Sequence, residues 1–332
     1  GLYFLSLMIA FVLGAYLFGI GTLTLGSVYL VFQYIEMAHR PIDQIREQLI
    51  DLQKAGASIE RVEGLFATQT RLDQRDHKDL PDGPLRVTFD DVTFSYDDDA
   101  GHETVLDEVS FDIAPGRVVG LIGRTGSGKS TIARLITRLY EPQVGQVLVG
   151  GEPTWDIELP RLRERVAMVT QDVQLFRATI RENLTFFDDS VSDDRLLEVI
   201  HRLELDGWLD SLPNGLDTML ESGSGGLSAG QAQLLAFTRV FLRDPGVVVL
   251  DEASSRLDPA TEALIEKAVD HLLEDRTAIL IAHRLATVER ADDIIILEDG
   301  RVLEQGVRTE LKANPDSVFS HLLVAGMEEA LA

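Results

Sequence analysis

The chain has 332 residues, 45% of them hydrophobic, which is long enough for two domains that each bury a core. Its 55 acidic residues outnumber its 30 basic residues and give a formal net charge of −25, which argues against a nucleic acid partner because phosphate backbones bind to basic faces. The absence of cysteine excludes disulfide bonds and thiolate metal sites.

The N-terminal segment, residues 2–35, contains no charged residue. As a single helix it would be about 51 Å long, more than the roughly 30 Å core of a bilayer requires. The glycine-rich stretch GIGTLTLG at residues 19–26 therefore predicts a turn between two membrane spans, at residues 2–18 and from about Ser27 onward. A cleaved signal peptide would need a basic start and a shorter apolar run. A buried helix pair in a soluble protein remains the alternative.

The second span is predicted to continue beyond the apolar run as one long helix to residue 67, bent near Pro41. Three polar residues at its membrane end face either a bundle interior or the headgroup zone, and the sequence leaves both interpretations open: Gln33, Glu36 and His39. The cations that follow place this end in the cytoplasm by the positive-inside rule: Arg40, Arg46 and Lys54.

Residues 71–84 are polar, contain proline and glycine, and predict a linker between residues 1–70 and a second domain at residues 85–332. In that domain strand-like segments alternate with helical ones, which predicts a mainly parallel sheet with helices on both faces. The predicted strands are residues 85–96, 105–113, 118–122, 146–151, 166–171, 247–251, 278–282 and a hairpin at 294–306. The predicted helices are residues 131–140 and 261–275, and residues 172–245 are mainly helical.

A phosphate-binding loop, GRTGSGKS at residues 123–130, lies between an apolar strand and a helix. Its glycines leave backbone N–H groups free to turn around an anion, and the helix N-terminus favours phosphate. Lys129 supplies a positive charge for the outer phosphates and Ser130 a hydroxyl for Mg²⁺. The predicted nucleotide contacts are Gly123, Arg124, Thr125, Gly126, Ser127, Gly128, Lys129, Ser130 and Thr131.

Two adjacent carboxylates follow the apolar run VVVL at residues 247–250. Beside a phosphate loop, Asp251 would hold Mg²⁺, usually through water, and Glu252 would polarise the attacking water. The alternative is a plain acidic pair at the end of a strand.

A third glycine-rich stretch, GSGGLSAGQ at residues 223–231, runs into an amphipathic helix and offers a second helix N-terminus to a phosphate. One nucleotide cannot easily occupy both helix ends of one chain. We therefore expect LSAGQ to contact the nucleotide of a partner chain, which predicts a dimer with two nucleotides at its interface.

Taken in this order and spacing, GRTGSGKST, LSAGQ, VVVLDE and IAHRL resemble the nucleotide-binding domain of an ABC transporter. The tandem spans and long helix resemble the C-terminal part of the transmembrane domain in ABC exporters. The resemblance implies an α/β P-loop NTPase fold of the ABC type, with a helical subdomain at about 172–245, preceded by transmembrane helices. It also implies ATP and Mg²⁺ as cofactors.

The resemblance assigns further roles in the site. Tyr96 would stack on adenine, Gln171 would touch Mg²⁺ or water, and His283 would hold the γ-phosphate. The implied catalytic residues are Lys129, Gln171, Glu252 and His283, and the implied metal contacts are Ser130, Gln171 and Asp251. Across the dimer, the implied contacts are Ser228, Gly230, Gln231 and, from the segment 255–258, Asp258.

Two residues depart from the usual family pattern: Ala229 stands where glycine is common, and Arg256 where a small residue is more frequent. Because Ala229 adds only a methyl group, we expect hydrolysis to survive. Length is the larger departure, since half-exporters carry six spans and about two are predicted here. The chain therefore looks like a fragment.

The predicted function is that of the ATP-hydrolysing subunit of a multi-pass cell-membrane exporter with its ATP-binding domain in the cytoplasm. Its partners would be a second half-transporter in a homodimer or heterodimer, the lipid bilayer and an unidentified exported substrate. Coupling would pass through residues 171–183, with Phe176, Ile180 and Leu184 packing on a cytoplasmic loop. The alternatives are a regulatory, weakly hydrolysing half of a heterodimer and a soluble ATPase; a GTPase is disfavoured because no NKxD signature is present.

Overall fold

The computed structural model describes residues 2–67, 72, 78–96, 104–170, 173–221, 227–251, 259–282 and 285–325. The chain divides into two compact units, Gly1–Arg71 and Leu72–Ala332. Gln171, Glu252, Asp258 and His283 lie outside the described residues, as do residues 255–257.

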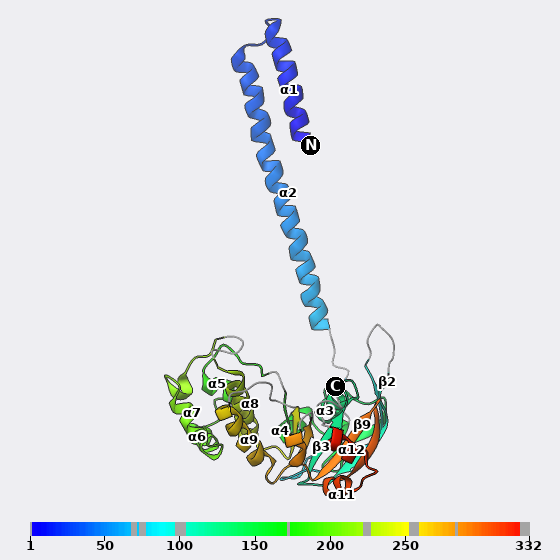
Figure 1. The fold of residues 1–332 in the computed structure, drawn as a ribbon. Coiled ribbons are helices and arrows are strands. Elements are labelled where there is room, and N and C mark those ends of the chain that lie inside the picture. Colours follow the sequence, from blue (N-terminus) through cyan, green and yellow to red (C-terminus); the bar gives the residue numbers. More distant parts are fainter. Residues whose placement is uncertain are drawn as a thin grey trace. The chain divides into compact units, whose positions relative to one another are not determined.

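The first unit is a helical hairpin of α1 (Leu2–Gly19) and α2 (Leu25–Ala67), coloured blue in Figure 1. The connecting turn is accommodated by Gly21, whose φ of 75° lies in the left-handed region that glycine adopts without strain. The helices approach closely at Gly14, where an added Cβ would lie 2.9 Å from Val28 Cγ1. The second helix continues through Pro41 without interruption, so the predicted long helix is present.

Among the residues that the structure describes, no helix combines the length and the apolar character that crossing a membrane requires. The two predicted membrane spans are therefore not confirmed.

The second unit contains two sheets and the remaining helices. Its strands are β1 (Val87–Ser95), β2 (Thr104–Ile113), β3 (Val118–Gly123), β4 (Val144–Val149), β5 (Glu152–Pro153), β6 (Val166–Val169), β7 (Val247–Asp251), β8 (Thr277–Ile281), β9 (Asp293–Glu298) and β10 (Arg301–Val307). Its α-helices are α3 (Lys129–Ile136), α4 (Leu159–Arg165), α5 (Ile180–Thr185), α6 (Asp193–Arg202), α7 (Asp206–Asp210), α8 (Ala229–Arg243), α9 (Pro259–Leu273), α10 (Leu285–Glu289), α11 (Arg308–Ala313) and α12 (Val318–Ala325). Two short 3₁₀ helices are η1 (Thr154–Asp156) and η2 (Gly215–Asp217).

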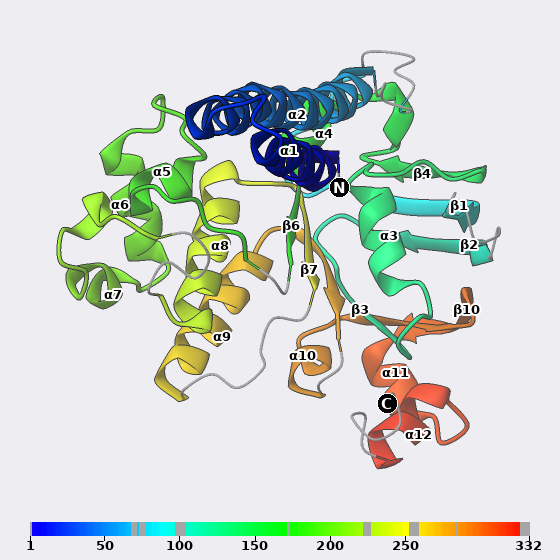
Figure 2. The ribbon, with the colours of Figure 1, turned by 90° about the horizontal axis from the view of Figure 1, so that it is seen from above.

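The larger sheet has the order β10-β9-β3-β8-β7-β6, and all of its neighbouring pairs are parallel except β10 with β9. The smaller sheet is antiparallel, in the order β2-β1-β4-β5. Figure 2 shows α5–α9 gathered at one end of the unit, away from the four-stranded sheet. The predicted hairpin is confirmed: Glu298 pairs with Arg301 across a two-residue turn in which Asp299 and Gly300 both have positive φ.

Alternation along the central strands divides the apolar side chains between two cores. On β7, Val248 and Leu250 pack into a core that includes the α5–α9 region. Val247 and Val249 point the other way, into a core shared with α3 and the four-stranded sheet. Because side chains alternate with period two, a strand covered on both faces must be apolar at every position. This explains the continuous run VVVL and places the sheet in the middle of the unit.

Two boundaries differ from expectation. The helix after the phosphate loop ends at Ile136 rather than continuing to residue 140, because Arg138 turns to a φ of 51°. Its buried guanidinium pairs with Glu141 at 2.7 Å and donates to the Ile157 carbonyl at 3.1 Å, contacts that replace another helical turn. Residues 78–84, predicted as linker, pack on the second unit: Leu80 is buried, and the Lys78 N–H donates to the Asp156 carbonyl.

Candidate ATP-binding site

The phosphate loop connects β3 to α3 and has a conformation that only glycine adopts easily. Gly126 and Gly128 have φ values of 86° and 104°. A Cβ on Gly128 would lie 2.5 Å from Leu106 Cδ2, so the position has no room for a side chain. Helix α3 begins at Lys129 directly after the loop. The free N–H groups of its first turn and the positive end of its dipole therefore face the loop.

Replacing Gly128 by alanine is expected to weaken ATP binding more than tenfold. It should also lower the free energy of unfolding by more than ~1–2 kcal/mol, which is the cost of placing alanine in the left-handed conformation. The added methyl group combines that strain with the Leu106 contact. The matched control is Gly116→Ala, which has a φ of 75° but nothing within 4 Å. Nucleotide titration and denaturant unfolding of both variants measure the effects. Equal losses of ATP affinity and stability in Gly128→Ala and Gly116→Ala would contradict a specific role of Gly128 in the phosphate loop.

Lys129 holds its charge inside the loop. The side chain is 6% exposed, and its Nζ donates to the carbonyl oxygens of Gly123 at 2.6 Å and Arg124 at 2.8 Å. Burial lowers the pKa of Lys129, and the opposing attraction of Asp251 raises it. The ammonium group is thus positioned by neutral carbonyls, with a carboxylate in electrostatic reach.

A cavity of about 370 Å³ opens over the loop, within the size range of small-ligand sites. Its lining brings together segments that are far apart in the sequence: Tyr96, Val105, Thr125, Gly126, Gly128, Lys129, Ser130, Thr131, Arg134, Asp251 and Ile281. Eight of the predicted contacts are among them. The predicted contacts Gly123, Arg124 and Ser127 do not line it. The Ser127 hydroxyl is buried, with no hydrogen-bond partner among the described residues.

Tyr96 is held in place by two side chains of α3 and by two aromatic rings. Its hydroxyl lies 3.0 Å from Thr131 Oγ1 and accepts a hydrogen bond from Arg134 Nη1 at 2.8 Å. The rings of Phe94 and Tyr140 contact it edge-on, with centroids at 4.9 and 5.1 Å. The sequence analysis did not predict Arg134. Its spacing from Thr131, a predicted site residue, could have indicated it, because residues three apart on a helix share a face.

The N-terminus of α8 forms a separate feature. Ser228 Oγ accepts from the Gln231 N–H at 3.2 Å, and Gln231 Oε1 accepts from the Ser228 N–H at 2.9 Å, which is a capping box. Neither these two residues nor Gly230 lines the cavity over the phosphate loop. The N-terminus of α8 is therefore not part of the cavity that α3 lines.

Four predicted site residues, Gln171, Glu252, Asp258 and His283, cannot be placed because they lie outside the described residues. The described strands before three of them end at Val169, Asp251 and Ile281. In parallel sheets, ligands bind outside the carboxyl ends of the strands, and the phosphate loop follows the carboxyl end of β3.

No group of three or more His, Asp or Glu side chains suited to a metal ion occurs among the described residues. Mg²⁺ needs no such group, because it is usually held by one or two protein oxygens together with substrate phosphates and water. Ser130 and Asp251, which both line the cavity, fit that donor set.

The fold and the cavity define a P-loop ATP-binding domain. Residues 106–255 match the family model described as ABC transporter. The ATP-dependent lipid A-core flippase of Idiomarina loihiensis is 36% identical over 316 residues, which cover 95% of this chain and 54% of the flippase. A fatty acid ABC transporter ATP-binding/permease protein of Mycobacterium bovis is 34% identical over 293 residues, covering 88% and 46%.

Among solved structures, a bacterial Atm1-family ABC exporter with ATP bound matches with a TM-score of 0.69 and 31% identity, over 92% of this chain and 53% of that one. The chain belongs to the ABC transporter family and is similar to exporters of that family over most of its length. The comparisons are consistent with ATPase activity. The chain spans about half the length of the curated relatives it matches.

Proposed function

We propose that the chain is the ATP-hydrolysing part of a membrane exporter and couples ATP binding and hydrolysis at a dimer interface to substrate translocation. The observation that carries the proposal is the single cavity in which Lys129, Ser130 and Asp251 meet beside Tyr96 at the N-terminus of α3. These are the groups that phosphoryl transfer uses for positioning and charge stabilisation. The names of the relatives, a flippase and a transporter, support the same class.

Each residue has a distinct role in this proposal. Lys129 binds the outer phosphates and Tyr96 stacks on adenine. Ser130, Asp251 and Gln171 hold Mg²⁺, which when bound neutralises charge developing on the phosphoryl oxygens. Glu252 accepts a proton from the attacking water. His283 donates a hydrogen bond to the γ-phosphate and keeps the water in line.

The proposed dimer accounts for the N-terminus of α8. Ser228, Gly230 and Gln231 do not line the cavity over the phosphate loop, and we propose that they and Asp258 contact the nucleotide of a second copy or of a related subunit. Whereas Arg256 lies outside the described residues, Ala229, the other departure from the family pattern, has an exposed side chain beside the intact capping box. This favours a hydrolysing subunit over a regulatory one.

The test is ATP-dependent association. With Mg²⁺ and a non-hydrolysable ATP analogue, the chain is expected to double in mass by light scattering. Ser228→Arg should abolish the doubling without affecting nucleotide binding, because the long cation fills the phosphate contact. Ser192→Arg is the matched control, since Ser192 caps α6 by the same side-chain bond to the residue three positions on. Association that survives Ser228→Arg would refute the shared site.

We further propose that the hairpin belongs to the membrane part of the exporter. Helix α2 buries no side chain, and large apolar side chains of the hairpin are exposed, among them Phe4, Phe11, Tyr16, Tyr29 and Phe32. A soluble surface rarely exposes so many together, whereas lipid or neighbouring helices would cover them. Multi-pass insertion with the ATP-binding domain in the cytoplasm would then follow from the cations after the apolar run.

Coupling is proposed to pass through the surface near Phe176. The expectation that Ile180 and Leu184 contact a cytoplasmic loop is wrong, because both are buried in the core with α8. Phe176 is 44% exposed and lines a second cavity, of about 350 Å³. The cavity, rather than the face of α5, is therefore the surface available to a moving partner.

A further inference from the structure

The end of β1 is followed by a tyrosine whose orientation depends on its side-chain contacts. Tyr96 comes directly after Ser95, the last residue of β1, and lies beyond the pairing of β1 with β2. Gln143 fixes the backbone just before it: Gln143 Nε2 donates to the Ser95 carbonyl at 2.7 Å, and Gln143 Oε1 accepts from the Ser95 N–H at 2.9 Å. The orientation of the Tyr96 ring is therefore set by the groups around the ring and not by the sheet.

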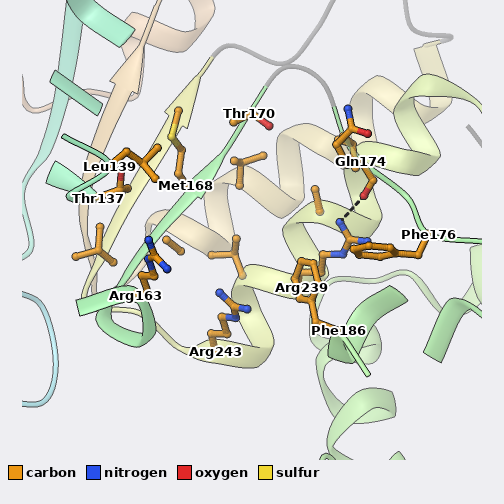
Figure 3. A pocket seen from close by; sticks show the side chains of 16 residues that line it. Thr137, Leu139, Arg163, Met168, Thr170, Gln174, Phe176, Phe186, Arg239 and Arg243 are labelled. Carbon is orange, nitrogen blue, oxygen red and sulfur yellow. Dashed lines mark hydrogen bonds between the residues drawn. The ribbon is translucent and has the colours of Figure 1, made fainter. Parts of the chain in front are cut away.

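Two aromatic rings pack on this tyrosine. Phe94 and Tyr140 both contact its ring edge-on. Past the end of α3, Leu139 lines the second cavity, whose side chains Figure 3 shows, whereas its neighbour Tyr140 contacts Tyr96. Such ring contacts are not hydrogen bonds, so the phenolic hydroxyl of Tyr96 needs partners elsewhere.

Helix α3 supplies these partners. Arg134 Nη1 donates to the Tyr96 hydroxyl at 2.8 Å, and Thr131 Oγ1 lies 3.0 Å from the same oxygen. A guanidinium group has donors only, so the Tyr96 oxygen accepts from Arg134 and its own hydrogen is available for Thr131. Arg134 Cζ also lies over the Tyr96 ring, 5.7 Å from its centroid, within the range of a cation–π contact. One side chain of α3 thus contacts both the hydroxyl group and the ring.

The surroundings of Arg134 leave two roles to compare. It is exposed, lines the nucleotide cavity and forms no ion pair with any described residue. Such an arginine can bind a phosphate directly or can hold Tyr96. Helix geometry favours the second role, because Arg134 follows Ser130 by four residues and so lies about 6 Å farther along the axis from the phosphate-binding end of α3. Its observed polar contact in the cavity is the Tyr96 hydroxyl.

We propose that Arg134 is a positioning residue of the nucleotide site, which holds the Tyr96 ring ready to stack on adenine through the hydrogen bond to the Tyr96 hydroxyl. The inference rests on the proposed function, in which Tyr96 stacks on the base. A ring that is held before the nucleotide arrives loses less conformational freedom on binding. Arg134 therefore raises the affinity for the adenine part of ATP and takes no part in the chemistry at the γ-phosphate.

The experiment is a double-mutant cycle in the full chain, with ATP and inorganic tripolyphosphate as the two probes in titration calorimetry. Arg134→Ala is expected to weaken ATP binding about tenfold, as for the loss of one hydrogen bond to a charged group. Tyr96→Phe keeps the ring, removes the hydroxyl and should cause the same loss. The double variant should bind ATP no more weakly than either single variant, because both changes break one interaction. Tripolyphosphate has no base, and its affinity should be the same in every variant.

Two further measurements separate positioning from a purely structural role. Arg134→Ala should raise KM for ATP and leave kcat at saturating ATP unchanged, because the lost interaction contributes to binding and not to the chemical step. Arg134→Lys should recover part of the ATP affinity, because an ammonium group also donates to a hydroxyl. Arg195→Ala is the matched control and should change neither affinity: Arg195 on α6 donates to Glu198 at 2.8 Å and does not line the nucleotide cavity.

Additive losses of ATP affinity in the double variant, or unchanged ATP affinity in Arg134→Ala, would overturn the inference. A parallel loss of tripolyphosphate affinity in Arg134→Ala would overturn it in favour of a direct contact between Arg134 and a phosphate. These results would leave the proposed function intact, because the unmodified chain still binds and hydrolyses ATP. An unmodified chain that binds ATP no more tightly than tripolyphosphate would instead refute the proposed stacking of Tyr96 on adenine, and one that does not hydrolyse ATP would refute the proposed function as a whole.

Discussion

Replacing Lys129 by alanine is expected to reduce ATP hydrolysis by roughly 10²–10³-fold, the typical loss when one preorganised charge-stabilising group is removed. Lys129 is only 6% exposed, and its ammonium group donates to the Gly123 and Arg124 carbonyls. Water therefore cannot replace the charge at the same position. The measurement is phosphate release at saturating Mg²⁺ and ATP, with nucleotide affinity determined separately.

Lys129→Arg should not restore activity, because a planar guanidinium cannot occupy the point between two carbonyls that the ammonium fills. Lys267→Ala is the matched control: this lysine is exposed and pairs with Glu204 on the surface. Wild-type turnover in Lys129→Ala would show that the cavity over the phosphate loop is not where ATP is hydrolysed.

The second large effect is expected for Glu252→Gln. Removing a general base typically costs about 10²–10⁴-fold in rate. Glutamine has the same shape without the charge, so ATP should bind as before and hold the proposed dimer closed. Single-turnover hydrolysis and light scattering with Mg²⁺ and ATP measure both consequences.

The control is Glu289→Gln, an exposed carboxylate at the end of α10. Turnover near the unmodified level in Glu252→Gln would remove this residue from the mechanism and leave Asp251 as the acidic residue of the site. Slow turnover of Glu252→Gln without accumulation of a dimer would show that Glu252 acts in hydrolysis but that bound ATP does not hold two copies together.

Much of the second unit could be predicted because its signals are local. Apolar runs such as VVVL at 247–250 mark strands covered on both faces, and the Asp299-Gly300 pair marks a two-residue hairpin. The phosphate loop was recognisable because its glycines and lysine must follow one another in the chain. The C-terminal end of α3 could not be predicted in this way, because it depends on contacts of the Arg138 side chain with Glu141 and with the Ile157 carbonyl.

The nucleotide cavity was predicted only in part for the same reason. Lys129 and Ser130 come from one motif, whereas Arg134 lines the cavity beside Tyr96, a residue that directly follows β1 and whose position the motif does not set. The sequence predicts that Ile180 and Leu184 contact a cytoplasmic loop, but the packing of α5 on α8 buries both side chains. Helical periodicity shows that one face of a helix is apolar, but it does not show whether that face packs in the core or contacts a partner.

The order of residues along the chain was sufficient to determine the phosphate loop, the strand ending at Asp251 and the long helix after Leu25, since each depends on neighbours within one element. Only the tertiary structure decided that β8 lies between β3 and β7, that Val105 and Ile281 line the cavity with Lys129, and that three arginines from α4 and α8 line a second cavity without a described carboxylate. These arrangements join segments separated by tens of residues or more. They are set by how the helices and sheets pack, and no local pattern carries that information.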